Sequence, residues 1–167
     1  EMKKKIDVFE YTGQILNGVK SGVLITSKSD ERVNSMTISW GMLGIEWGKP
    51  VFITVIREGR FTRELLEQNG EFTVNIPLDC SVLRTGYLSV PAANWPGTES
   101  ISVPGIKELP LTLECRIVYK QKQDINAMEK ETVEKFYPQN VESSFTGSNR
   151  DVHIAYYGEI VNAYIIE

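Results

Sequence analysis

VFITVIREGRFTRELLEQNGEFTVNI (residues 51–76) joins two segments of strand character through a short segment of helical character. The β-branched residues of 51–57 are typical of a buried strand, and the alternating apolar residues of 71–76 indicate another strand. Between them, Thr62 is placed to cap the free amides of a helix over 62–69, and Gly70 follows as a stop. This stretch therefore predicts a sheet protein in which a short helix connects two strands.

The segment 33–40 (VNSMTISW) alternates as a strand does, but one of its faces is unusual. One face carries Val33, Ser35, Thr37 and Ser39, and the other carries Asn34, Met36, Ile38 and Trp40. Three hydroxyl groups therefore stand in a row where a core strand would carry aliphatic side chains. Such a face is suited either to solvent or to a polar ligand.

The remaining predicted strands cover 23–26, 111–120 and 153–166, with Gly158 as a bulge in the last. Predicted helices cover 11–20 and 127–136. The segment 84–110 is rich in proline and glycine, which favours an irregular surface segment. About six strands, two or three short helices and no regular βαβ alternation argue against a doubly wound parallel sheet. We expect one mainly-β domain over 1–167, a mostly antiparallel β-barrel with peripheral helices.

Composition sets the broad class. With 167 residues, of which 41% are hydrophobic and 24% charged, the chain is expected to form a single globular domain. A net charge of −4 gives no reason to expect nucleic acid or an anionic membrane as partner. The opening EMKKKIDVFE lacks the apolar stretch of a signal peptide, and no apolar run approaches the roughly 20 residues of a membrane span. With two cysteines outside any CxxC arrangement, these features predict a cytoplasmic protein with free thiols.

The common cofactor and catalytic motifs are missing from the sequence. GxGxxG, GxxxxGK[ST] and GxSxG do not occur, and His153 is the only histidine, which excludes any site that needs two imidazoles. Cys80, Cys115 and His153 lack the spacing of a zinc clip. Cys115 stands on an apolar strand face, where a buried thiol is the usual outcome. We expect no metal site.

What the residues do support is an anion site. A phosphate monoester needs donors from several directions, namely hydroxyls, backbone amides and a guanidinium group. The hydroxyl face of 33–40 offers the first kind, and Arg57, Arg60 and Thr62 stand at a strand end and a helix start that offer the others. A hairpin through 44–50 would bring the two segments side by side. A solvated strand face and surface arginines are the alternative, and the residues alone leave both open.

Four separated motifs, in order, resemble the flavin reductase-like proteins of the FMN-binding split barrel superfamily, close to its flavoredoxin-type members. The motifs are NSMTISWG (34–41), WGKPVFITVIREGRFTRELLEQNGEFTVNIP (47–77), LECRIVYK (113–120) and NRDVHIAYYGEIVNAYIIE (149–167). The match runs nearly from end to end, beginning at the first helix. The resemblance implies a homodimer of split β-barrels that binds FMN near the subunit interface.

The resemblance also implies roles for individual residues. The residues along the flavin and its ribityl phosphate would be Met36, Thr37, Ile38, Ser39 and Trp40. Arg57, Arg60 and Thr62 would hold the phosphate, so that the hydroxyl-bearing strand becomes a phosphate and ribityl cradle. His153, in the motif HxxYYGEI, is the side chain expected near the flavin ring or the nicotinamide. No protein nucleophile is expected, because the isoalloxazine performs the chemistry itself.

Family members take electrons from NAD(P)H or a redox partner into FMN, so the resemblance implies an NAD(P)H-dependent FMN oxidoreductase (flavin reductase). The alternatives are a non-catalytic flavin-binding or electron-carrier protein, and a degenerate split barrel that serves only as a binding scaffold. One departure bears on this choice. The 84–98 loop, RTGYLSVPAANWPGT, lacks the Gly- and Ser-rich CGxxSGRDxDKF element of the family. This departure bears on the contacts that this loop would make with the flavin ring, and on the reductase activity.

Overall fold

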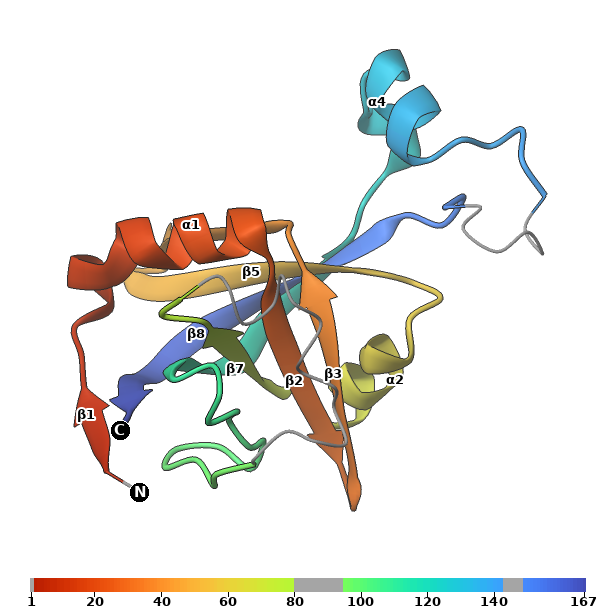
Figure 1. Ribbon diagram of the computed structural model, residues 1–167. Helices are drawn as coiled ribbons and strands as arrows, with labels where there is room; N and C mark the ends of the chain where they lie inside the picture. The colour runs from red at the N-terminus through yellow and green to blue at the C-terminus, as the bar shows by residue number, and fades with distance from the viewer. Residues whose placement is uncertain (1, 80–94, 143–148) are drawn as a thin grey trace.

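The computed structural model describes residues 2–79, 95–142 and 149–167, which form one eight-stranded sheet with short helices around it (Figure 1). The strands are β1 (Lys3–Lys5), β2 (Val23–Ser29), β3 (Arg32–Ile38), β4 (Gly41–Glu46), β5 (Lys49–Arg57), β6 (Glu71–Ile76), β7 (Leu111–Lys122) and β8 (His153–Ile166). The helices are η1 (Val8–Tyr11), α1 (Thr12–Ser21), α2 (Phe61–Gln68), η3 (Ile125–Ala127) and α4 (Lys130–Phe136).

Every strand pair in the described ranges is antiparallel, which confirms the predicted mainly-β, mostly antiparallel fold. The strand order is β3-β2-β6-β7-β8-β5-β4, and β1 pairs with the C-terminal end of β8. β3 and β4 are the two edges of this order, although only Ser39 and Trp40 separate them in the chain. The strands wrap around a shared interior (Figure 1). The barrel is therefore split between β3 on one side and the β4–β5 hairpin on the other.

β4 was not predicted, and its presence changes how the two site-bearing segments meet. The hairpin through 44–50 pairs β4 with β5, whereas β3 pairs with β2. The expected side-by-side pairing of 33–40 with 51–57 is therefore wrong. The turn of the hairpin is formed by Trp47 and Gly48, both at positive φ. The pattern of β4 is weak because Met42 and Ile45 are exposed apolar residues and glycine interrupts the alternation.

The interior of the barrel is one apolar core. Side chains with no exposed surface reach it from β2, β5, β6, β7 and β8: Ile25, Phe52, Phe72, Leu113 and Tyr156. Cross-strand packing of this kind is what stabilises a sheet curved on itself, because each strand contributes every second residue to the same interior. The core fixes the positions of β3, β5 and β8, whose ends carry the predicted site.

The outer face of β2 and β6 is also buried, because the segment 95–110 lies over it. Leu24 packs there against Ile106 and Leu109. The side-chain carbonyl of Asn75 accepts a hydrogen bond from the backbone N–H of Ile106 over 3.1 Å. The irregular surface segment predicted over 84–110 is thus, in its described part, a cover that makes two neighbouring strands buried on both faces.

Gly158 is not the predicted bulge. It pairs in register with Phe52 on β5 and with Ile117 on β7, and the irregularities of the β7–β8 ladder fall on either side of that pair. A Cβ atom at this position would lie 2.5 Å from Cζ of Phe72 and 2.9 Å from Cβ of Cys115. The glycine is therefore required because the Phe72 ring occupies the space of a side chain.

The predicted helices at 11–20 and 127–136 are present with shifted bounds. α1 buries Ile15 and Val19, whereas Leu16 is 45% exposed. α4 begins only at Lys130, after the 3₁₀ turn η3. Figure 1 shows that β7 and β8 extend beyond the barrel and carry α4 away from it. At the base of this projecting arm, His153 at the start of β8 lines the predicted site.

Candidate functional site

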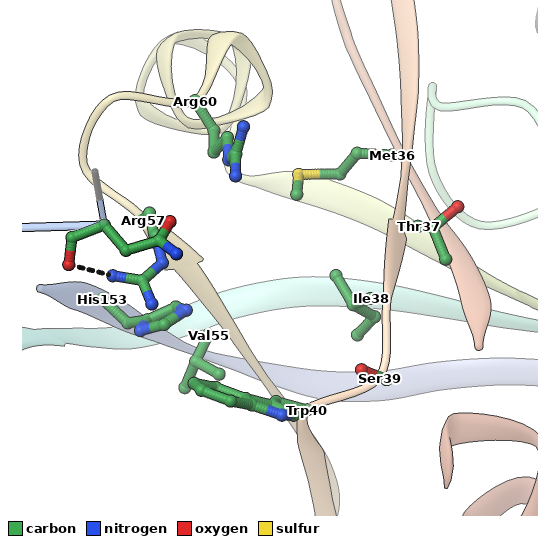
Figure 2. Close-up of a pocket in the computed structure, with 10 residues that line it drawn as sticks. Met36, Thr37, Ile38, Ser39, Trp40, Val55, Arg57, Arg60 and His153 are labelled. Carbon is green, nitrogen blue, oxygen red and sulfur yellow. Dashed lines mark hydrogen bonds between the residues drawn. The ribbon is translucent and has the colours of Figure 1, made fainter. Parts of the chain in front are cut away.

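A cleft of about 220 Å³ opens at the split of the barrel, between the end of β3 and the ends of β5 and β8 (Figure 2). Its lining residues are Met36, Thr37, Ile38, Ser39, Trp40, Val55, Arg57, Arg60, Asn149 and His153. β4 pairs with β5 only as far as Thr54, which leaves the last residues of β5 facing the split. Seven of the eight residues predicted to bind the cofactor, and His153, therefore meet at one cleft.

β3 turns its apolar face toward this cleft. Met36 points toward Arg60, whereas the side chain of Thr37 lies on the other side of the strand (Figure 2). Ser35 is buried, and its hydroxyl lies 2.6 Å from Oγ1 of Thr26. The expected cradle of three hydroxyls is therefore wrong for Ser35, whose face belongs to the side covered by 95–110. Thr37 is exposed and contributes to the wall at its rim.

Arg57 holds the walls of the cleft in position. Its Nη1 donates to the backbone oxygens of Asn149 and Asp151 over 3.0 and 2.6 Å, and its Nη2 donates to that of Phe136 over 2.9 Å. The guanidinium also lies over the ring of Tyr137, 4.9 Å from its centroid. These contacts tie the end of β5 to the arm and to the start of β8. Because three of its five N–H donors are engaged by carbonyl oxygens and Nη1 also lies 3.9 Å from Oδ1 of Asp151, Arg57 is poorly suited to the expected role of binding phosphate directly.

Arg60, unlike Arg57, has a guanidinium group that is available to bind an anion. It is the N-cap residue of α2, and its side chain reaches from the helix start toward Met36 (Figure 2). Within 2–79, 95–142 and 149–167, its guanidinium has no hydrogen-bond or ion-pair partner. Among the described residues no side chain caps α2, so the predicted capping by Thr62 is wrong, and of the first three amides of the helix only that of Arg63 has a hydrogen-bond partner, the carbonyl oxygen of Arg60. A free guanidinium beside an uncapped helix start is a favourable environment for an anion.

A second hollow of about 370 Å³ adjoins the cleft at this helix start. It shares Met36, Thr37 and Arg60 with the cleft and adds Asn34, Phe61 and Thr62. Thr62 is 1% exposed, and its Oγ1 accepts a hydrogen bond from Nδ2 of Asn34 over 2.7 Å. The hydroxyl proton of Thr62 is still available for donation. Thr62, the eighth predicted residue, thus lines the polar extension of the cleft.

The opposite end of the cleft is aromatic. The ring of Trp40 lies 5.1 Å from that of His153 and 5.1 Å from that of Phe136, measured between centroids. Trp40 itself is 41% exposed, so part of its indole surface is open to a ligand. Val55 and Ile38 add aliphatic surface beside it. A flat, largely apolar group is therefore suited to this end, and an anion to the other.

His153 is buried at the start of β8 and is neutral at physiological pH. Burial lowers its pKa to about 4, and the positive charges of Arg57 and Arg60 act in the same direction, while Asp151 opposes them. Its Nδ1 lies 2.7 Å from the hydroxyl of Tyr137. The imidazole therefore contributes a polar but uncharged group to the cleft wall.

Four contributors to these walls were not predicted as site residues: Asn34, Val55, Phe61 and Asn149. Asn34 stands two residues before Met36 on the same strand face, and Val55 two residues before Arg57 on β5, so the two-residue period was a usable signal for both. Asn149 comes from the chain before β8 and is held by Arg57. Its position depends on tertiary contacts that no local pattern contains.

Other expectations concern chemistry away from the cleft. Cys115 is buried with a free thiol, and burial raises its pKa well above the ordinary value. No group of three or more His, Cys, Asp or Glu residues in the described ranges is arranged to hold a metal ion. Across those ranges, too, no helix has the length and apolar character needed to cross a membrane. Cys80 and the 84–98 loop, apart from its last four residues, lie outside the described residues.

Comparison with known proteins places the chain in context. A family model described as a flavin reductase like domain matches residues 17–167. An uncharacterized protein of Archaeoglobus fulgidus is 30% identical over 99 residues, which cover 53% of this chain and 55% of that protein. The match thus spans about half the length of this curated relative.

Two solved structures share the fold. Flavoredoxin from Methanosarcina acetivorans has a TM-score of 0.59 and 22% identity, covering 87% of this chain and 68% of that chain. Nitrilotriacetate monooxygenase component B from Bacillus cereus has a TM-score of 0.61 and 17% identity, covering 100% of this chain and 83% of that chain. At these identities the likeness establishes the fold alone.

Proposed function

Because the family model spans most of its length, this chain belongs to the flavin reductase-like family, and from that premise we propose that it is an FMN-dependent oxidoreductase. Its electrons would come from NAD(P)H, or from a redox partner, and pass through FMN to an acceptor in the cytoplasm. The observation that carries the proposal is the two-ended cleft. Within the described ranges, a guanidinium without a partner and a helix start without a side-chain cap lie at one end, and the partly exposed indole of Trp40 lies at the other.

The polar end of the cleft fits a phosphate. Arg60 supplies a guanidinium without a partner in the described ranges, and the start of α2 supplies backbone amides that no side chain caps. Thr62 supplies a hydroxyl proton from a buried position fixed by Asn34. A guanidinium, backbone amides and a hydroxyl thus surround one hollow, which is the donor set that a dianionic ester requires.

The remaining part of FMN fits the rest of the cleft. The segment 36–40 runs from the polar end to the aromatic end and lines the cleft along its whole length. Met36, Ile38 and the rim residues Thr37 and Ser39 would flank the ribityl chain, and Trp40 would lie against the isoalloxazine. Among the strands that the structure describes, β3 is an edge strand, so alternate backbone groups on its unpaired side could also hydrogen-bond the ligand.

FMN, when bound, supplies the hydride and electron transfer chemistry of its isoalloxazine ring. The chain's own residues have positioning and environmental roles. Arg60 and the α2 amides would fix the phosphate and so set the register of the ligand along the cleft. Trp40 and Val55 would exclude water from one side of the ring. Arg57 holds the arm and the start of β8 in place through its carbonyl contacts, so we assign it to shaping the site.

A homodimer is part of the same proposal. Trp47, Tyr119 and Tyr157 form an aromatic cluster with centroid distances of 5.0–6.2 Å, and Trp47 is 57% exposed. Exposed Met42 lies beside a further hollow of about 430 Å³, which shares Val55 with the cleft. An exposed apolar surface of this kind is typical of a protein interface. A second copy docked there would cover the aromatic end of the cleft.

The activity is tested by following NADH and NADPH oxidation at saturating FMN. We expect turnover with at least one of the two nucleotides that depends on both protein and flavin. Arg60→Ala should reach the rate of the parent protein only at a higher FMN concentration. FMN binding with no oxidation of either nucleotide would instead identify an electron carrier. Absence of FMN binding would remove the proposal altogether.

A further inference from the structure

Three hydrogen-bonded contacts behind the cleft wall determine where the proton of His153 resides. Nδ1 of His153 lies 2.7 Å from the hydroxyl oxygen of Tyr137. That hydroxyl lies 3.0 Å from Oε1 of Gln123, and the backbone N–H of His153 donates to the same Oε1 over 3.3 Å. Tyr137 is 4% exposed, its ring is nearly perpendicular to the imidazole at 5.6 Å between centroids, and the Arg57 guanidinium lies over it. Each group in this chain of contacts therefore has a fixed partner.

The backbone N–H of His153 fixes the orientation of Gln123. An N–H group can only donate, so the atom of Gln123 that faces it is the carbonyl oxygen and not the amide nitrogen. A carbonyl oxygen can only accept, and the Tyr137 hydroxyl has one proton, so that proton is directed at Gln123. The contact between Tyr137 and Nδ1 then needs its proton from the imidazole. With the proton on Nε2 instead, one of the two Tyr137 contacts would join two acceptors.

We propose that Gln123 and Tyr137 hold His153 in its Nδ1–H tautomer, which leaves a lone pair on Nε2 to accept a hydrogen bond from an N–H or O–H group of the cleft ligand. Gln123 and Tyr137 are positioning residues, since they act through the imidazole. Figure 2 shows the ring of His153 at the cleft wall between Arg57 and Trp40. No hydrogen bond joins Nε2 to any residue that the structure describes.

The charges around the ring favour this arrangement. Arg57 and Arg60 lie on the cleft side and Asp151 precedes the strand, and the low pKa of about 4 keeps the ring neutral at pH 7. Besides His153, the polar side chains that line the cleft are Arg57 and Arg60, which can only donate, and Thr37, Ser39 and Asn149, which can donate or accept. Of the charged and imidazole groups at the cleft, Nε2 of the Nδ1–H tautomer is the one that can only accept. A ligand that placed a carbonyl oxygen against it would bring two acceptors together, so His153 selects for an imide N–H or a sugar hydroxyl at this point.

The tautomer is measurable directly, because the chain contains a single histidine. Long-range ¹H–¹⁵N spectra of the ¹⁵N-histidine-labelled, flavin-free protein at neutral pH distinguish a protonated ring nitrogen from an unprotonated one. We expect Nδ1 to be protonated and Nε2 to be unprotonated. The opposite assignment, or a mixture of the two forms, overturns the proposal.

Two variants test the positioning residues. In Gln123→Met, the Tyr137 proton loses its acceptor and turns to Nδ1, so the imidazole proton should move to Nε2. Gln123→Glu keeps an acceptor for both donors, and its neutral imidazole should retain the Nδ1–H form. A merely structural role for Gln123 predicts the same tautomer in both variants. That result would overturn the assignment even if stability changed.

The ligand-side part of the inference rests on the proposed function and is tested by adding FMN to the labelled protein. Donation to Nε2 should move its resonance strongly upfield while Nδ1 moves little, and quenching of flavin fluorescence reports binding independently. Quenching without movement of Nε2 overturns the acceptor role alone. If no quenching occurs, the proposed function and the acceptor role for FMN both fail, while the tautomer is still decided by the spectrum of the free protein.

Discussion

The side-chain amide of Asn34 donates a 2.7 Å hydrogen bond to Oγ1 of Thr62, which joins β3 to the first turn of α2. Thr62 is buried, and both residues line the polar hollow beside the cleft. The two walls that would hold a phosphate are therefore fixed relative to one another before any ligand binds. Preorganisation of this kind reduces the ordering cost of binding.

Removal of this contact is expected to cost both stability and affinity. Asn34→Ala should lower the free energy of unfolding by about 0.5–1.5 kcal/mol, because the Thr62 hydroxyl loses its partner in a buried position. Urea unfolding of Asn34→Ala, Thr62→Val and the double variant measures the coupling between the two side chains. A coupling energy close to zero would show that the contact does not form in solution.

Arg60→Ala should weaken FMN binding by about 1.5–3 kcal/mol through loss of a charge-assisted contact with the phosphate. Arg116→Ala is the matched control, since it removes the same charge from an exposed arginine that donates to Ser100 and pairs with Glu71 on another part of the barrel. Fluorescence titration gives both dissociation constants. If the two variants weaken FMN equally, the effect is one of net charge and Arg60 has no place in the site.

Gly158→Ala is expected to destabilise the protein by about 1–3 kcal/mol, because the new methyl group would overlap the Phe72 ring in the core. Gly44→Ala is the control: it lies on β4 with no atom within 4 Å of the added Cβ. Thermal or urea unfolding should leave Gly44→Ala within about 0.5 kcal/mol of the parent. Equal effects at both positions would mean that Phe72 does not occupy the space above Gly158.

The buried imidazole predicts a pH dependence of stability. The pKa of His153 is about 4 in the folded protein and near 6.5 when unfolded, so between these values the unfolded state binds the extra proton. Stability should therefore be unaffected by this group above about pH 6.5 and should fall as the pH drops toward 4. The loss should reach about 2–3 kcal/mol. The free energy of unfolding is measured against pH for the parent and for His153→Asn. The carboxylates contribute equally to both profiles, so the difference between them reports His153 alone. Parallel pH profiles would contradict the shifted pKa.

Dimerisation is tested at the exposed aromatic cluster. Trp47→Glu should raise the dimer dissociation constant at least tenfold, about 1.4 kcal/mol, because a carboxylate would be buried against apolar surface. Leu16→Glu places the same charge at an exposed apolar position on α1 and should leave the dimer intact. Sedimentation velocity over a concentration series distinguishes the two. A monomeric parent protein, or equal weakening by both variants, would count against this interface.

The fold was predictable from the sequence to the extent that it depends on local pattern. The two-residue periods of 71–76 and 111–115 correspond to β6 and to the buried part of β7. β4 escaped prediction because it is an edge strand whose apolar side chains remain exposed and whose glycines interrupt the alternation. The apparent irregularity of 95–110 concealed a packing role that rests on Ile106 and Leu109, residues that no periodic pattern marks.

The candidate site was predictable in its membership but not in its orientation. Residues 36–40 and Arg60 meet at one cleft, as the motifs indicated. Which face of β3 is turned inward depends on what covers the other face, and that cover is far away in the sequence. Arg57 shows the same limit, since its carbonyl partners at Asn149 and Asp151 lie more than ninety residues away. Long-range contacts of this kind leave no local signal.

The central claim is that the cleft binds FMN with its phosphate at the start of α2. Titration of the flavin-free protein with FMN and with riboflavin, which lacks the phosphate, tests it most directly through quenching of flavin fluorescence. We predict one FMN per chain and an affinity for FMN at least tenfold higher than for riboflavin, about 1.4 kcal/mol, with the difference lost in Arg60→Ala. Equal affinities for the two flavins, or no quenching by either, would contradict the account.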